Sequence, residues 1–228
     1  MRRPIEMVTA SLNQLAGVRD YSYVFVKRER CDGQMAEFDA IYMKIRKQPF
    51  SVYVHTLGPV QPRGQEGIYV EGRNENKALV HLVGFRHKLV GVLRLNPEGP
   101  EMMAGNRYPI TSAGFEKLLE KVLLMYRDEA KQPESQVQFF SGAKVDGRSC
   151  LCVEVSHPVR KPEFFFQMTR IFYDDELNVP IRWEAYDWPA QPGAQPQLGE
   201  EYTFRDVRLN LGLTDADFDT ENSQYGFK

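Results

Sequence analysis

The sequence predicts a mainly β (α+β) protein built on a strongly curved antiparallel sheet of about eleven strands, with two amphipathic helices covering its concave face. Segments with apolar residues at every second position recur along the chain, as expected of strands with one buried face. Turn residues such as Asp146-Gly147 join most of them over hairpin-length links. Only two segments have helical spacing, so the strand–helix alternation of a parallel sheet is absent.

The first segment, residues 5–17, is predicted to be a helix ended by Gly17, because its apolar residues recur every three or four positions. A strand over 20–30 follows. An Asp-Gly turn at 31–34 then leads to a return strand over 38–47 with Ile41, Met43 and Ile45 on one face. Residues 49–55 alternate again, which places Phe50, Val52 and Val54 inward.

Three short strands are predicted at 67–71, 78–85 and 88–95. The second helix is expected at about 112–130, capped by Thr111 or Ser112. One side of this helix is lined by Phe115, Leu118, Leu119, Val122, Leu123 and Tyr126.

The second half is again β, with strands expected at 136–145, 149–157, 164–174, 180–188 and 200–210. The alternation of Phe164, Phe166, Met168 and Phe172 indicates one apolar face. The proline-rich segment 188–196 is interpreted as a surface loop, because only one strand and a tail follow it. We therefore expect a single domain over residues 1–228.

Charge and composition exclude several classes of protein. The 228 residues carry a net charge of -2, so no basic field favours nucleic acid. We expect no transmembrane segment, because no run of 18 apolar residues occurs, and no export signal in this chain. The three cysteines are too few for a disulfide framework, and we expect Cys31, Cys150 and Cys152 to be unbonded to one another.

Reactive groups do not form a recognisable catalytic pattern. The four histidines lack metal-ligand spacing, although His81 and His87 lie on adjoining predicted strands. The acidic residues between Asp215 and Glu221 lack the turn glycine of a calcium loop and are interpreted as a solvated tail. We therefore expect no catalytic residues, no metal and no cofactor. The enzymatic alternative is a hydrolase or isomerase that uses a buried polar pair such as His81 and Glu154.

Large apolar side chains gather on one predicted face of the sheet. A closed core explains this excess, and the alternative is a cleft for an apolar ligand between sheet and helices. The residues that alternation assigns to its lining are Phe25, Ile41, Met43, Phe50, Val52, Phe166, Met168, Trp183 and Phe204. Met102 and Met103 precede the second helix in a Gly/Pro-rich segment and fit a pliable lid.

Several segments resemble the LolA/LolB-type bacterial lipoprotein carriers, and more closely an uncharacterised bacterial family related to them. The segments that carry the resemblance are Pro49–Tyr53, Arg170–Asp174, Pro180–Asp187, Phe204–Asn210 and Leu211–Phe218. The resemblance implies an unclosed antiparallel barrel of about eleven strands, with an N-terminal helix and a further helical insertion over an apolar concavity. The chain departs from the carriers at Arg46, which is not followed directly by proline or soon after by another arginine.

The resemblance implies non-enzymatic binding or carriage of a lipid or acyl ligand in the periplasm or cell envelope. Such binding needs only an apolar concavity, so the departure at Arg46 affects handover to a lipoprotein receptor more than binding itself. The expected partner is a hydrophobic small molecule or acyl chain, with another envelope protein as the alternative. The rival function is a structural or protein-interaction module with a closed core.

Overall fold

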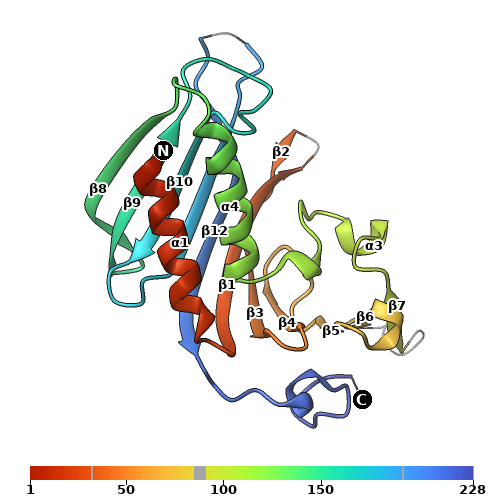
Figure 1. The fold of residues 1–228 in the computed structure, drawn as a ribbon. Coiled ribbons are helices and arrows are strands. Elements are labelled where there is room, and N and C mark those ends of the chain that lie inside the picture. Colours follow the sequence, from red (N-terminus) through yellow and green to blue (C-terminus); the bar gives the residue numbers. More distant parts are fainter. Residues whose placement is uncertain (32, 85–90, 192, 228) are drawn as a thin grey trace. The chain divides into compact units, whose positions relative to one another are not determined.

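The computed structural model describes residues 1–31, 33–84, 91–191 and 193–227 (Figure 1). The protein is mainly β: a 12-stranded antiparallel sheet is accompanied by an N-terminal helix and a second long helix. The strand order is β7-β6-β5-β4-β3-β1-β12-β11-β10-β9-β8, with β2 paired to β1. The chain divides into two compact units, described separately below, and β1 and β12 contribute residues to both.

Unit 1 contains residues 1–17, 28–35 and 114–203. Its strands are β2 (Gln34–Met35), β8 (Gln136–Val145), β9 (Arg148–Ser156), β10 (Met168–Asp174), β11 (Pro180–Asp187) and the first part of β12 (Gln197–Leu209). Asp146 and Gly147 form the β8–β9 turn with φ angles of 47° and 82°, the geometry of the two-residue hairpin turn that the Asp-Gly pair predicts. The short β2 accounts for the strand beyond the eleven expected.

Two helices belong to unit 1: α1 (Arg2–Ala16) and α4 (Phe115–Glu129). They lie side by side across the strands of this unit (Figure 1). The buried stripe of α4 consists of Phe115, Leu119, Val122, Tyr126 and Glu129, much as its periodicity predicts. The expected cap at Thr111 or Ser112 is wrong, because the N-cap is Gly114, whose φ of 107° suits glycine.

Unit 2 contains residues 18–27, 36–113 and 204–228. Its strands are most of β1 (Asp20–Cys31), β3 (Asp39–Arg46), β4 (Ser51–Gly58), β5 (Glu66–Val70), β6 (Ala78–His81), β7 (Val92–Leu95) and the end of β12. It also contains four short helices: η1 (Asn74–Asn76), α3 (Pro100–Met103), η2 (Ile110–Ser112) and, after β12, η3 (Asp215–Phe218). The expected strands 78–85 and 88–95 extend into residues outside the described part. His87 also lies outside it, so its placement beside His81 on adjoining strands stays a prediction.

The strand expected at 164–174 begins only at Met168, so the prediction of one apolar face from Phe164 to Phe172 is wrong. Backbone pairing explains the boundary, because Gln167 N donates to Tyr186 O at 2.9 Å while the residues before it form turns. Within β10, Met168 and Phe172 share the face of Arg170, and Ile171 lies on the other face.

Candidate functional site

An aromatic and aliphatic face runs across the strands of unit 2. Residues directly opposite each other in an antiparallel pair point to the same side. The register pairs Phe25 with Ile41, and Met43 with both Tyr23 and Val54. The predicted lining residues Phe25, Ile41, Met43 and Val52 therefore share one face, because Val52 pairs with Ile45, two positions from Met43.

Phe204 from β12 packs against this face. Its ring centroid lies 5.1 Å from that of Tyr23 and 5.3 Å from that of Phe25. Met43 and Phe204 are buried, whereas Phe25 is half-buried. The predicted residue Phe50 lies further along the unit, with its ring 6.3 Å from Tyr69.

The predicted lid residues belong to α3 and its surroundings. Met102 packs against a buried cluster of Tyr69, Ala78 and Val80, together with Phe50 and other partly buried apolar side chains. Met102 and Met103 are both half-buried. Met102 therefore helps to cover the β5–β6 part of unit 2.

The predicted lining residues of unit 1 do not all lie together. Phe166 contacts Trp183 edge to face, with ring centroids 6.4 Å apart. Trp183 lies opposite Ile171 and Tyr202 in the register, which places it on the face away from Arg170. Met168 lies on the Arg170 face, so it is separated from Trp183 by the thickness of the sheet.

Buried carboxylates accompany Trp183. Its indole Nε1 donates to Glu200 Oε1 at 2.7 Å, and the Tyr202 hydroxyl donates to Glu29 Oε1 at 2.6 Å. The same hydroxyl lies 3.4 Å from Glu200 Oε2. Glu29 and Glu200 are 4% and 2% exposed, so these carboxylates add fixed polar groups to an otherwise aromatic face. The alternation of apolar residues in the sequence does not reveal Glu29 and Glu200, because a charged residue is not expected on a buried face.

The opposite face of unit 1 carries a ladder of ion pairs. Arg170 Nε lies 2.7 Å from Glu154, and Arg182 Nε lies 2.7 Å from Glu184. Arg182 also contacts Glu201, which Arg28 joins at 2.6 Å. Arg182 and Glu184 therefore lie on the face of the sheet opposite Trp183.

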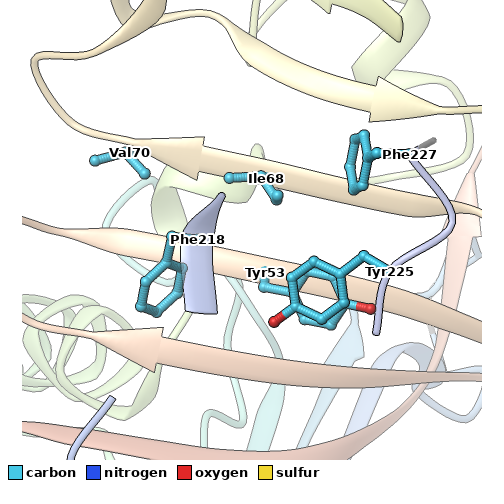
Figure 2. Packing of buried hydrophobic residues seen from close by; sticks show 6 residues of the cluster. All are labelled: Tyr53, Ile68, Val70, Phe218, Tyr225 and Phe227. Atoms are coloured by element: carbon cyan, nitrogen blue, oxygen red, sulfur yellow. The ribbon is translucent and has the colours of Figure 1, made fainter. Parts of the chain in front are cut away.

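The acidic residues Asp215, Asp219 and Glu221 are exposed, as a solvated tail predicts, but the aromatic residues of the same tail are packed in unit 2. Phe218, Tyr225 and Phe227 form a buried cluster with Tyr53, Ile68 and Val70 (Figure 2). The Tyr225 ring stacks on Tyr53 at 4.0 Å between centroids. This tail covers the face opposite Met43, because Tyr53 alternates with Val52 and Val54.

Ion pairs fix the tail in place. Asp215 binds Arg46 at 2.7 Å and Arg73 at 2.9 Å, while Asp217 accepts from Lys44 at 2.8 Å. These two hydrogen bonds from arginine lower the pKa of Asp215. Burial alone would raise the pKa of Asp217, but the hydrogen bonds from Lys44 and from the Thr214 backbone lower it.

The two residues suggested as a catalytic pair belong to different units, and each has partners within its own unit. His81 Nδ1 lies 3.5 Å from Glu66, whereas Glu154 belongs to the ladder and pairs with Arg170. Glu66 also accepts from the Tyr53 hydroxyl and the Gly226 backbone, each at 2.6 Å. Glu66 therefore helps to attach the tail. The pKa of Tyr53 is raised mainly by burial and further by its hydrogen bond to Glu66.

A surface depression of about 490 Å³ lies in the Gly/Pro loop after β4, lined by residues 57–63. Asp39 stabilises this loop by accepting from the backbone of Val60 and Gln61, each at 3.2 Å. Leu57 and Val60 are exposed. None of the predicted lining residues belongs to it.

Other expected features concern cysteines, metals and membranes. Cys31, Cys150 and Cys152 are free thiols. Among the described residues, no group of three or more His, Cys, Asp or Glu side chains could hold a metal ion. No helix in that part of the chain is long and apolar enough to span a bilayer.

Solved structures resemble this chain at low sequence identity. The Mycobacterium tuberculosis lipoprotein LppX is 13% identical over 94% of this chain and 97% of its own, with a TM-score of 0.51. A LolA superfamily protein from Nitrosomonas europaea is 12% identical over 93% of this chain and 97% of its own, with a TM-score of 0.34. MucB in the Pseudomonas aeruginosa MucA/MucB complex is 12% identical, over 93% of this chain and 60% of its own, with a TM-score of 0.48.

No curated protein sequence matches this chain. A family profile does, over residues 18–227, which include the strands of both units, helix α4 and the packed tail. The expected membership of an uncharacterised protein family is thereby confirmed. The chain belongs to the DUF1571 family, a protein family of unknown function.

Proposed function

We propose that this protein binds and carries a hydrophobic, lipid-like ligand in the cell envelope and has no catalytic activity. The observation that carries the proposal is the apolar face of unit 2, where Phe25, Ile41 and Met43 meet in register and Phe204 packs beside them. Burial of an acyl chain against such a face contributes roughly 0.8 kcal/mol per CH₂ group. Several methylene groups would therefore give useful affinity.

Unit 1 adds a second apolar surface to the proposal, formed by Phe166 and Trp183. We propose that this surface also binds apolar ligand, and that Met102 and Met103 of unit 2 act as a pliable lid. The fold shared with LppX and the resemblance to LolA-type carriers support this proposal. They also support an envelope location, with another envelope protein as a further partner.

A closed structural module is the alternative, and one observation favours it. Met102 and Ile110 already pack onto the Tyr69–Val80 cluster of unit 2, which leaves that part of the apolar face covered. In such a module the same aromatic residues would stabilise the core, and contacts with partners would be made elsewhere.

The test is ligand binding by the folded chain. Laurate or a hydrophobic dye should bind at tens of micromolar and raise the melting temperature by mass action. Met43→Asp should weaken binding at least tenfold, because it places a charge on the apolar face. Leu124→Asp is the matched control, since this leucine is 63% exposed on α4. Circular dichroism checks folding of both variants, and failure of both probes to bind the folded wild type would favour the closed module.

A further inference from the structure

Five polar side chains are buried together in unit 1. They are Tyr126 and Glu129 on α4, His157 directly after β9, and Thr169 and Tyr173 on β10. Each is at most 6% exposed. We refer to these five residues as the polar cluster.

Distances and electrostatic effects connect its members. His157 Nε2 lies 3.3 Å from Glu129 Oε1. Burial raises the pKa of Tyr126, the neighbouring Thr169 hydroxyl lowers it, and the Glu129 carboxylate raises it further. Burial also raises the pKa of Tyr173 strongly, with a smaller contribution from Tyr126. The cluster therefore joins the last turns of α4 to one face of β9 and β10.

Part of the hydrogen-bonding capacity of this cluster is unused. Within the described residues, Oε2 of Glu129, Nδ1 of His157 and the Tyr173 hydroxyl have no hydrogen-bond partner, whereas Glu129 Oε1 has the 3.3 Å contact with His157 and the Tyr126 hydroxyl neighbours Thr169. Buried polar atoms are nearly always hydrogen-bonded in folded proteins, because leaving them unsatisfied is costly. Three such atoms in one place indicate groups arranged to bind a polar molecule.

Buried aromatic side chains adjoin the polar cluster. The His157 ring stacks on Phe164, with centroids 3.8 Å apart and planes 8° from parallel. On β10, Thr169 and Ile171 share a face with Trp183, which lies opposite Ile171. Phe166 contacts Trp183 on the same side. A ligand chain lying on Phe166 and Trp183 would therefore have its polar end beside Thr169 and His157.

We propose that the polar cluster binds an uncharged, hydroxyl-bearing head group of the amphiphile carried by this protein. The inference rests on the proposed function and specifies the class of ligand. A hydroxyl can donate to Glu129 and accept from Tyr126 or Thr169, whereas an ammonium group only donates. A carboxylate head group would be repelled by the Glu129 carboxylate at close range.

The test compares two lipids of equal chain length by isothermal titration calorimetry. Wild-type protein should bind 1-monolauroylglycerol at least tenfold more tightly than laurate. Glu129→Gln should reduce this preference at least tenfold, because it removes the charge that disfavours laurate. Glu66→Gln is the matched control, since Glu66 is also a buried carboxylate beside a histidine but belongs to the tail attachment of unit 2. It should keep the wild-type preference.

Tyr126→Phe gives a second measurement if Glu129→Gln does not fold. Loss of this one hydroxyl should weaken monolauroylglycerol binding about three- to tenfold and leave laurate binding unchanged. Equal affinities of the wild type for the two lipids, or an unchanged preference in Glu129→Gln, would overturn the head-group inference alone. If neither lipid nor a hydrophobic dye binds the wild type, the proposed function fails and the inference fails with it.

Discussion

Replacement of Phe218 by alanine tests whether the C-terminal tail is an integral part of unit 2. Phe218 is 3% exposed and packs in the cluster with Ile68 and Val70 (Figure 2). The Arg46 guanidinium also lies 4.9 Å from the centre of its ring. Truncation of a buried phenylalanine costs about 3–5 kcal/mol, and loss of this largely shielded cation–π contact adds roughly 1–2 kcal/mol, because the Arg46 side chain is only 12% exposed.

We take the lower part of this range, about 3 kcal/mol, because the tail is a terminal segment that can repack. For a chain of this size each kcal/mol lowers the melting temperature by roughly 2–4 °C. Calorimetry should therefore show Phe218→Ala melting about 6–12 °C below the wild type. Leu211→Ala, in the same segment but at a position 43% exposed, should shift it by little. Equal shifts for the two variants would refute the packed tail.

Three further predictions concern buried polar groups. Trp183→Phe should cost about 1–3 kcal/mol in denaturant unfolding, because Glu200 loses a buried donor, and the cost should shrink in a Glu200→Gln background. The hydrogen bond from Arg148 lowers the pKa of Asp174 despite its burial. The stabilisation of the fold by ionised Asp174 is therefore present above the ordinary pKa of 3.8 and lost as the pH falls through the lower folded pKa. The difference in melting temperature between wild type and Asp174→Asn should stay constant from about pH 8 to 5 and vanish well below 4. Burial raises the pKa of Cys152 to about 12, so iodoacetamide at pH 8 should leave this thiol unmodified in native protein, and rapid labelling would contradict the buried placement.

Most strands and both long helices could be predicted, because period two and period 3.6 are local properties of the sequence. The boundaries that failed depend on pairing with distant segments. Phe164 and Phe166 alternate with Met168 as strand residues do, yet cross-strand pairing begins only beside Gln167. Alternation therefore assigned Met168 to the wrong side of the sheet relative to Trp183.

The polar part of the candidate site could not be predicted in the same way. Glu129 continues the α4 stripe of Tyr126 at a spacing of three, but a glutamate at a helix end is ordinarily solvated. Only the approach of His157 from the end of β9 makes it part of a buried cluster. The one local feature that could have indicated the polar cluster is a polar residue, Glu129, at a position where the helical period places a buried side chain.

The packed tail limits where an apolar ligand can bind in unit 2. Every residue of β5 is buried, so this strand is covered on both faces. The tail covers the Tyr53 and Ile68 side, and its ion pairs to Lys44 and Arg46 anchor it there. The ligand proposed for unit 2 would therefore reach the Met43 side without displacing the tail. That side is where β1 and β3 place Phe25 and Ile41, which are only half-buried and so retain apolar surface for an incoming chain.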